Sequence, residues 1–132
     1  MTTTKALLLS LGLALASAGT AEAFVARNGF VVQGAGSGQF QVMNRGGISA
    51  ANAWCAAGDY AMGVLGVAPA TPVFRVSEPP TPRGANIVFS LNGAGAASST
   101  GLATIGGSGG AAMTAVAARN MCNALMAPGG RR

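Results

Sequence analysis

Apolar and polar residues alternate in two short segments on either side of a glycine-rich stretch at positions 34–38. In the second segment, Gln39–Val42, the side chains of Phe40 and Val42 fall on the same side. Successive side chains of a strand point to opposite faces, so this pattern predicts a β-hairpin with both residues facing inward. The glycines would form its loop, and Gly46-Gly47 would end its second strand.

The next pattern has helical spacing and runs from about Ala50 to Leu65. Ser49 precedes it, and its hydroxyl can accept a hydrogen bond from a free amide in the first turn. The apolar residues at this spacing would form one buried stripe, in which Trp54 fills the space that the small residues leave. Asn52 and Asp59 are expected to lie outside it. The members of this stripe are Ala51, Trp54, Cys55, Gly58, Ala61, Met62 and Leu65.

Two later segments, 73–77 and 86–91, are rich in Val, Ile and Phe and are predicted to be strands, with Phe89 facing inward. The residues between them, 78–84, include three prolines. This composition favours a stiff turn, and the alternative is a polyproline ligand for a partner protein.

The composition changes at residues 92–111, where seven of the 20 residues are glycine. So little buriable surface predicts a flexible segment, with 100–105 as a candidate short edge strand. The glycines at 106–110 are interpreted as a linker, although their amides could also bind an anion at the start of a helix. A final helix is predicted at 112–126, and its inner face would carry Ala115, Ala118, Cys122 and Leu125.

The first 23 residues have the pattern of a secretory signal peptide. Lys5 precedes an apolar run from Ala6 to Ala18, and small residues end in Ala21-Glu22-Ala23. The run is shorter than the roughly 20 residues that cross a bilayer, which disfavours a retained anchor. We therefore expect cleavage before Phe24 and a periplasmic or extracellular location.

These elements follow in the order β-β-α-β-β-α and predict an α+β domain at 24–127, with a disordered tail at 128–132. Both helices would cover one face of a small antiparallel sheet. Cys55 and Cys122 fall on the inner stripes, and an isolated pair in an exported chain is by default a disulfide. Two buried free thiols are the alternative.

The chain carries a net charge of +5, and after cleavage it would hold seven arginines but only two acids. Arginine favours bidentate contact with phosphate or carboxylate groups. An anionic envelope component, such as lipid headgroups, lipopolysaccharide or nucleic acid, is therefore a candidate partner, and a merely solvated basic surface is the alternative. The expected anion contacts are Arg27, Arg45, Arg75, Arg83 and Arg119.

The residues that most enzymes use are missing from the predicted mature chain. It has no histidine and no lysine, so Ser-His, Cys-His and Ser-Lys pairs cannot form. Asp59 and Glu78 are its only acids, and we interpret them as ion-pair partners of arginine rather than as an acid/base pair. The cysteines are too far apart for a Cys-x-x-Cys redox motif. We expect no catalytic residue, metal, nucleotide or cofactor.

The octapeptide Trp54–Ala61 follows a signal peptide and two strands and precedes a late cysteine, Cys122. In this arrangement the chain resembles a family of small bacterial exported proteins of unknown function. The resemblance covers most of the predicted mature chain and implies a shared fold, but it implies no activity, substrate or catalytic residue.

The sequence thus predicts a non-catalytic binding or structural component of the bacterial envelope. A basic binder of anionic surfaces is the alternative. An enzyme or a thiol-redox protein is the reading that the residues support least.

Overall fold

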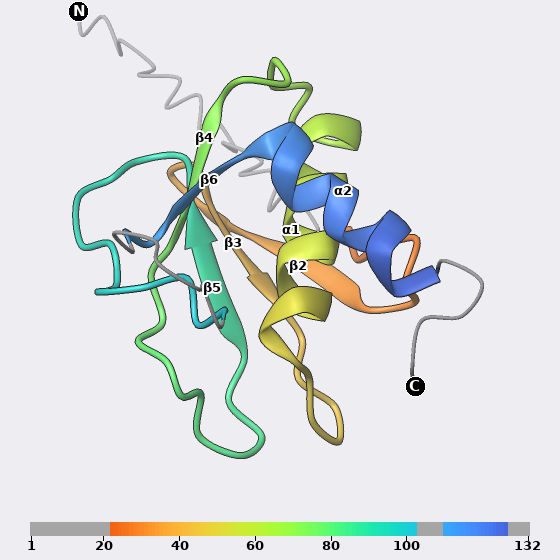
Figure 1. Cartoon of the computed structure of the whole chain (residues 1–132), viewed down its shortest axis with the longest axis vertical. Helices are drawn as coiled ribbons and strands as arrows, with labels where there is room; N and C mark the ends of the chain where they lie inside the picture. Colours follow the sequence, from red (N-terminus) through yellow and green to blue (C-terminus); the bar gives the residue numbers. More distant parts are fainter. Residues whose placement is uncertain (1–21, 103–109, 127–132) are drawn as a thin grey trace, which may run out of the picture.

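The α+β fold predicted from the sequence is confirmed by a computed structural model, which describes residues 22–102 and 110–126. Its strands pair in the order β1-β2-β3-β5-β4-β6, and every neighbouring pair is antiparallel. Both helices cover one face of this sheet (Figure 1). The elements are β1 (Phe24–Val25), β2 (Val31–Gly36), β3 (Gln39–Val42), α1 (Ala50–Gly63), β4 (Pro72–Arg75), β5 (Ile87–Ser90), β6 (Ala112–Thr114) and α2 (Ala115–Met126).

The predicted hairpin is formed by β2 and β3. Its turn is shorter than the glycine stretch, because β2 continues to Gly36 and only Ser37 and Gly38 connect the strands. Both turn residues have positive φ, 53° and 74°, as the tight hairpin turns that match strand twist require. Phe40 and Val42 are fully buried, which confirms the predicted inward face.

Two strands of the sheet were not predicted. β1 pairs with β2 along one edge, and its Phe24 ring lies 5.8 Å from the ring of Tyr60. β6 pairs with β4 at the other edge, at positions where the sequence predicts the first turn of a helix, so the predicted helix start at 112 is wrong. The edge strand expected at 100–105 is wrong for residues 100–102, which form no strand, and 103–105 lie outside the described residues.

Helix α1 begins as predicted, since the Ser49 hydroxyl accepts a hydrogen bond from the Asn52 amide at 3.2 Å. It ends at Gly63, two residues earlier than predicted. Leu65 therefore lies beyond the helix and is 39% exposed, so its assignment to the core is wrong. Asp59 was expected outside the stripe and is 5% exposed. Both flanks of α1 are covered, one by the sheet and one by α2, and a single amphipathic stripe does not describe such a helix.

The seam between α1 and α2 consists of small residues. Ala118 and Cys122 of α2 are fully buried against α1, and a Cβ added at Gly58 would overlap with the α2 backbone. The Cys55–Cys122 disulfide crosses this seam with a Cα–Cα distance of 4.8 Å, which confirms the predicted pair. Leu125, predicted to face inward, is 42% exposed and lies outside the seam.

Aromatic rings fill the space between α1 and the sheet. Trp54 packs edge-on against Phe89 with ring centroids 4.9 Å apart, and Phe40 packs on both Phe89 and Tyr60. Trp54, Phe40, Phe89 and Ala61 are all fully buried, as predicted for the core. Complete burial of one large side chain contributes roughly 1.5–3 kcal/mol, so this cluster stabilises the docking of α1 on the sheet.

Candidate binding site

Arg75 is the last residue of β4 and is 1% exposed. Its backbone is held on both sides, because its N–H donates to Ala111 O and its carbonyl accepts from the Ala97 N–H, each at 2.8 Å. The alternation along β4 buries Val73 and Arg75 and leaves Phe74 between them partly exposed. A charged side chain thereby occupies an inward position of the strand.

The Arg75 guanidinium joins two loops. Nε donates to Ser77 O at 2.8 Å and Nη2 donates to the Thr81 hydroxyl at 2.7 Å, both in the loop that follows β4. Nη1 donates at 3.0 Å to Thr100 O, in the segment that follows β5. The Trp54 indole N–H donates to the same carbonyl at 2.9 Å. The Thr100 carbonyl therefore connects Arg75 to the core of the protein.

No carboxylate of the described residues lies within ion-pair distance of Arg75. Burial lowers the pKa of its guanidinium, and the charge of Glu78 partly opposes this shift. Glu78 itself is exposed, and its carboxylate accepts hydrogen bonds from the N–H and the hydroxyl of Ser98. These two bonds lower the pKa of Glu78. Arg75 is thus a buried cation whose hydrogen bonds, among the residues described, go to neutral acceptors only.

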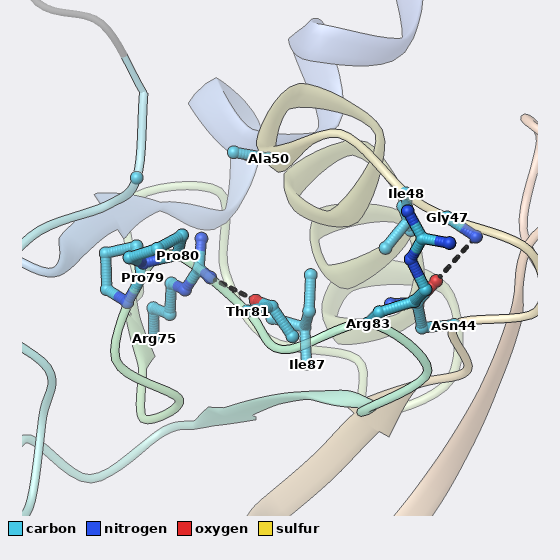
Figure 2. A pocket seen from close by; sticks show the side chains of 11 residues that line it. Asn44, Gly47, Ile48, Ala50, Arg75, Pro79, Pro80, Thr81, Arg83 and Ile87 are labelled. Atoms are coloured by element: carbon cyan, nitrogen blue, oxygen red, sulfur yellow. Dashed lines mark hydrogen bonds between the residues drawn. The ribbon is translucent and has the colours of Figure 1, made fainter.

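A pocket of about 400 Å³ opens beside Arg75, and we call it the arginine pocket. Arg75 and Arg83 lie on opposite sides of it, with Ile87 between them and Ala50 above (Figure 2). Ala50 is the first residue of α1, whose first turn contains no acidic residue, so the positive end of the helix dipole is not offset there. The lining residues are Asn44, Gly47, Ile48, Ala50, Arg75, Pro79, Pro80, Thr81, Arg83, Ile87 and Gly101.

A second cavity of about 410 Å³ adjoins the arginine pocket. Gly47 and Arg83 line both cavities, so Arg83 stands between them. The other lining residues of the second cavity are Gly46 and Gly84, and its wall is therefore largely main chain. The two cavities together form a site with one buried and one exposed arginine.

The five arginines predicted as anion contacts do not form one surface. Arg27 and Arg119 both pair with the buried carboxylate of Asp59, at 3.3 and 3.4 Å. Arg45 is exposed and does not line the arginine pocket. Arg75 is buried and lines a pocket together with Arg83, so it is not part of an open basic surface, and its contact with an anion stays a prediction.

The neutral residues of this site were not predicted from the sequence, above all Thr81, Thr100 and Gly101. A signal for Arg75 was present, because alternation from Val73 puts Arg75 on the inward face of its strand. No comparable signal existed for the Thr100 carbonyl, since a backbone acceptor is independent of residue type.

The remaining reactive groups have structural partners. Asp59 binds two arginines and Glu78 binds Ser98, so the only two acids of the predicted mature chain have separate partners. Both cysteine sulfurs are in the disulfide. Across the described residues, no three His, Cys, Asp or Glu side chains group as metal ligands, and no helix is long and apolar enough to span a membrane. The glycines at 106–110 were interpreted as a linker, with an anion site at a helix start as the alternative, and 106–109 lie outside the described residues. The helix itself begins at Ala115, after β6.

Comparison with protein-family models, with curated proteins and with solved structures found no match to this chain. The resemblance to a family of exported proteins therefore stays a prediction.

Proposed function

We propose that this chain is an exported, non-catalytic binding protein that takes an anionic group in the arginine pocket. The observation that carries the proposal is the burial of Arg75 beside an open cavity, with no carboxylate of the described residues in contact with its charge. Removing a charge from water costs several kcal/mol, and an opposite charge next to it offsets that cost. A bound anion would supply this opposite charge.

The donors of the pocket support the same proposal. An arginine has five N–H groups, and three of those of Arg75 have acceptors among the described residues, which leaves two for a ligand. Arg83 adds a second guanidinium on the opposite wall. Charge-assisted hydrogen bonds of this kind are about twice as strong as neutral ones.

Export of the protein is part of the proposal. The Cys55–Cys122 disulfide is compatible with an oxidising compartment, where such bonds persist. The first strand begins at Phe24, so cleavage before that residue would leave the sheet whole. The predicted alternative, binding of anionic surfaces through many arginines, has less support, because three of the five are buried or paired with Asp59.

The test is a titration of the purified exported protein with sodium acetate and sodium phosphate, followed by tryptophan fluorescence. Trp54 is the only tryptophan and shares the Thr100 carbonyl with Arg75, so an anion at Arg75 should change its emission. We expect saturable binding that Arg83→Gln weakens about tenfold, the value of one charge-assisted hydrogen bond. Arg45→Gln is the matched control, since Arg45 is exposed outside the pocket. Absence of saturable binding, or equal losses in both variants, would contradict the proposal.

A further inference from the structure

The arrangement of the two cavities narrows the class of ligand. We propose that the anionic group is the C-terminal carboxylate of an extended peptide, with the carboxylate at Arg75 and the preceding residues in the second cavity; this rests on the proposed function. The geometry of each part of the site favours this occupant over a free inorganic anion.

The end of the site at Arg75 fits a carboxylate. Two N–H groups of the guanidinium have no acceptor in residues 22–102 and 110–126, and a carboxylate accepts two parallel N–H bonds from arginine. Its single negative charge also equals the one buried positive charge. Inorganic phosphate has four oxygens and about two negative charges, which calls for more donors than Arg75 retains.

The walls next to Arg75 are apolar. Pro79 and Pro80 line the side at Arg75, and Ile87 lies between Arg75 and Arg83 (Figure 2). Ile48 lines the far side of the pocket, near Arg83. These side chains can pack on the aliphatic side chain of a terminal residue. None of the described residues that line the two cavities is aromatic, and sugars and nucleobases usually need an aromatic face for stacking.

The second cavity fits a peptide backbone. Gly46, Gly47 and Gly84 have no side chains to cover the main chain, and all three have positive φ, between 80° and 106°. Such a wall has no side chains to hold another main chain away, and main-chain hydrogen bonds are one way in which extended peptides are bound. The Gly47 N–H is not available for them, because it donates to Asn44 Oδ1 at 3.0 Å. Arg83, between the cavities, lies where the terminal residue and the preceding residues of the peptide would meet.

The experiment compares acetyl-Ala-Gly-Ala-Val carrying a free C-terminus with the same peptide carrying a C-terminal amide. Binding to the full-length protein is measured by Trp54 fluorescence and by calorimetry. We expect saturable binding of the free acid and at least tenfold weaker binding of the amide, because the amide has no charge for Arg75. Acetyl-valine should bind more weakly than the tetrapeptide, since it leaves the second cavity empty.

A variant pair tests the second cavity. Gly84→Asn adds a side chain there without a clash, because nothing lies within 4 Å of the added Cβ and Asn tolerates positive φ. Gly29→Asn is the control, since Gly29 has φ of +84°, has equally open surroundings and lies in the β1–β2 turn. We expect Gly84→Asn to weaken binding of the tetrapeptide about tenfold and to leave binding of acetyl-valine unchanged. Gly29→Asn should change neither affinity.

The outcomes separate this inference from the proposed function. Equal binding of acid and amide, or equal effects of the two asparagine variants, would overturn the peptide inference. Binding of acetate or phosphate without discrimination between the peptides would overturn it while the proposed function stands. Binding to phosphatidylglycerol vesicles in place of the peptides would also overturn it. Failure of every anion to bind would overturn both.

Discussion

Two regions of this protein contain a pair of arginines, and their electrostatics differ. At the seam between the helices, Arg27 and Arg119 share the buried carboxylate of Asp59, which also accepts the Arg27 backbone N–H at 3.0 Å. In the arginine pocket, Arg75 and Arg83 have no carboxylate partner among the described residues. The seam is covalently closed by a disulfide and packed with small residues. The pocket is held by hydrogen bonds between loops.

This difference separates a structural role from the binding role that we propose. A charge that is paired within the protein contributes to folding and has little left for a ligand. A buried charge that only neutral groups contact still gains from an external anion. The seam should therefore govern stability and the pocket should govern ligand affinity, and the following changes test that division.

The largest effect is expected from the double substitution Cys55→Ala with Cys122→Ala. The bridge spans 67 positions, and on the chain-entropy model its removal costs about 4 kcal/mol in the free energy of unfolding. Urea unfolding measures this loss, and reduction of the unmodified protein is the control. Acetate affinity of the molecules that remain folded should be unchanged. A loss below about 1 kcal/mol would be inconsistent with a stabilising seam.

The next largest effect concerns the close approach of the helices. In Gly58→Ala, the new Cβ would overlap with the Arg119 amide nitrogen and lie 2.7 Å from the Ala118 carbonyl carbon. We expect a loss of about 2 kcal/mol, since overpacking exceeds the gain in helix propensity. Gly63→Ala in the same helix has nothing within 4 Å and should be neutral or slightly stabilising in thermal unfolding. Similar values for both variants would mean that α2 shifts to accept the methyl group.

A substitution on the pocket side should lower the stability by no more than Gly58→Ala does and should change the pocket more. Gly101 has φ of +78°, and a Cβ there would overlap with Arg75 Nη1 and lie 3.2 Å from Pro79 Cβ. Gly95 has a similar φ of +76° with nothing nearby. We expect losses of about 2 kcal/mol for Gly101→Ala and about 1 kcal/mol for Gly95→Ala. Only Gly101→Ala should alter Trp54 emission and acetate binding, and an equal change in both variants would show that the Arg75–Thr100 link is unimportant.

The smallest effect depends on pH. Hydrogen bonds from Ser98 lower the pKa of Glu78 below its ordinary value of 4.5. A carboxyl group with a lowered folded-state pKa contributes stability above its unfolded-state pKa and loses it as the pH falls through the folded-state pKa. Stability should thus include this small contribution at pH 7 and lose it only below 4.5. Urea midpoints of Glu78→Gln and the unmodified protein should differ at neutral pH and converge in acid, and a constant difference would exclude this role of Glu78.

Much of the architecture could be predicted because it depends on repeated patterns. The β2–β3 hairpin and the buried positions of β5 follow from alternation of apolar and polar residues along each strand. The start of α1 follows from the Ser49 cap and the helical spacing after it. The disulfide could be predicted because only two cysteines exist. The candidate site could not be predicted as a unit, although Arg75 and Arg83 were both among the expected anion contacts.

The sequence alone determined those helices and strands that are long enough to show a repeating pattern of apolar residues. It also determined which charged residues and cysteines are present. The tertiary structure decided the rest. The edge strands β1 and β6 have two and three residues, too few for a period to show, and they exist only through pairing with distant strands. Asp59 is buried because a second helix covers its side of α1, and Arg75 faces a cavity because three separate loops meet around it. Such environments form between segments far apart in the chain, so no local pattern of residues could reveal them.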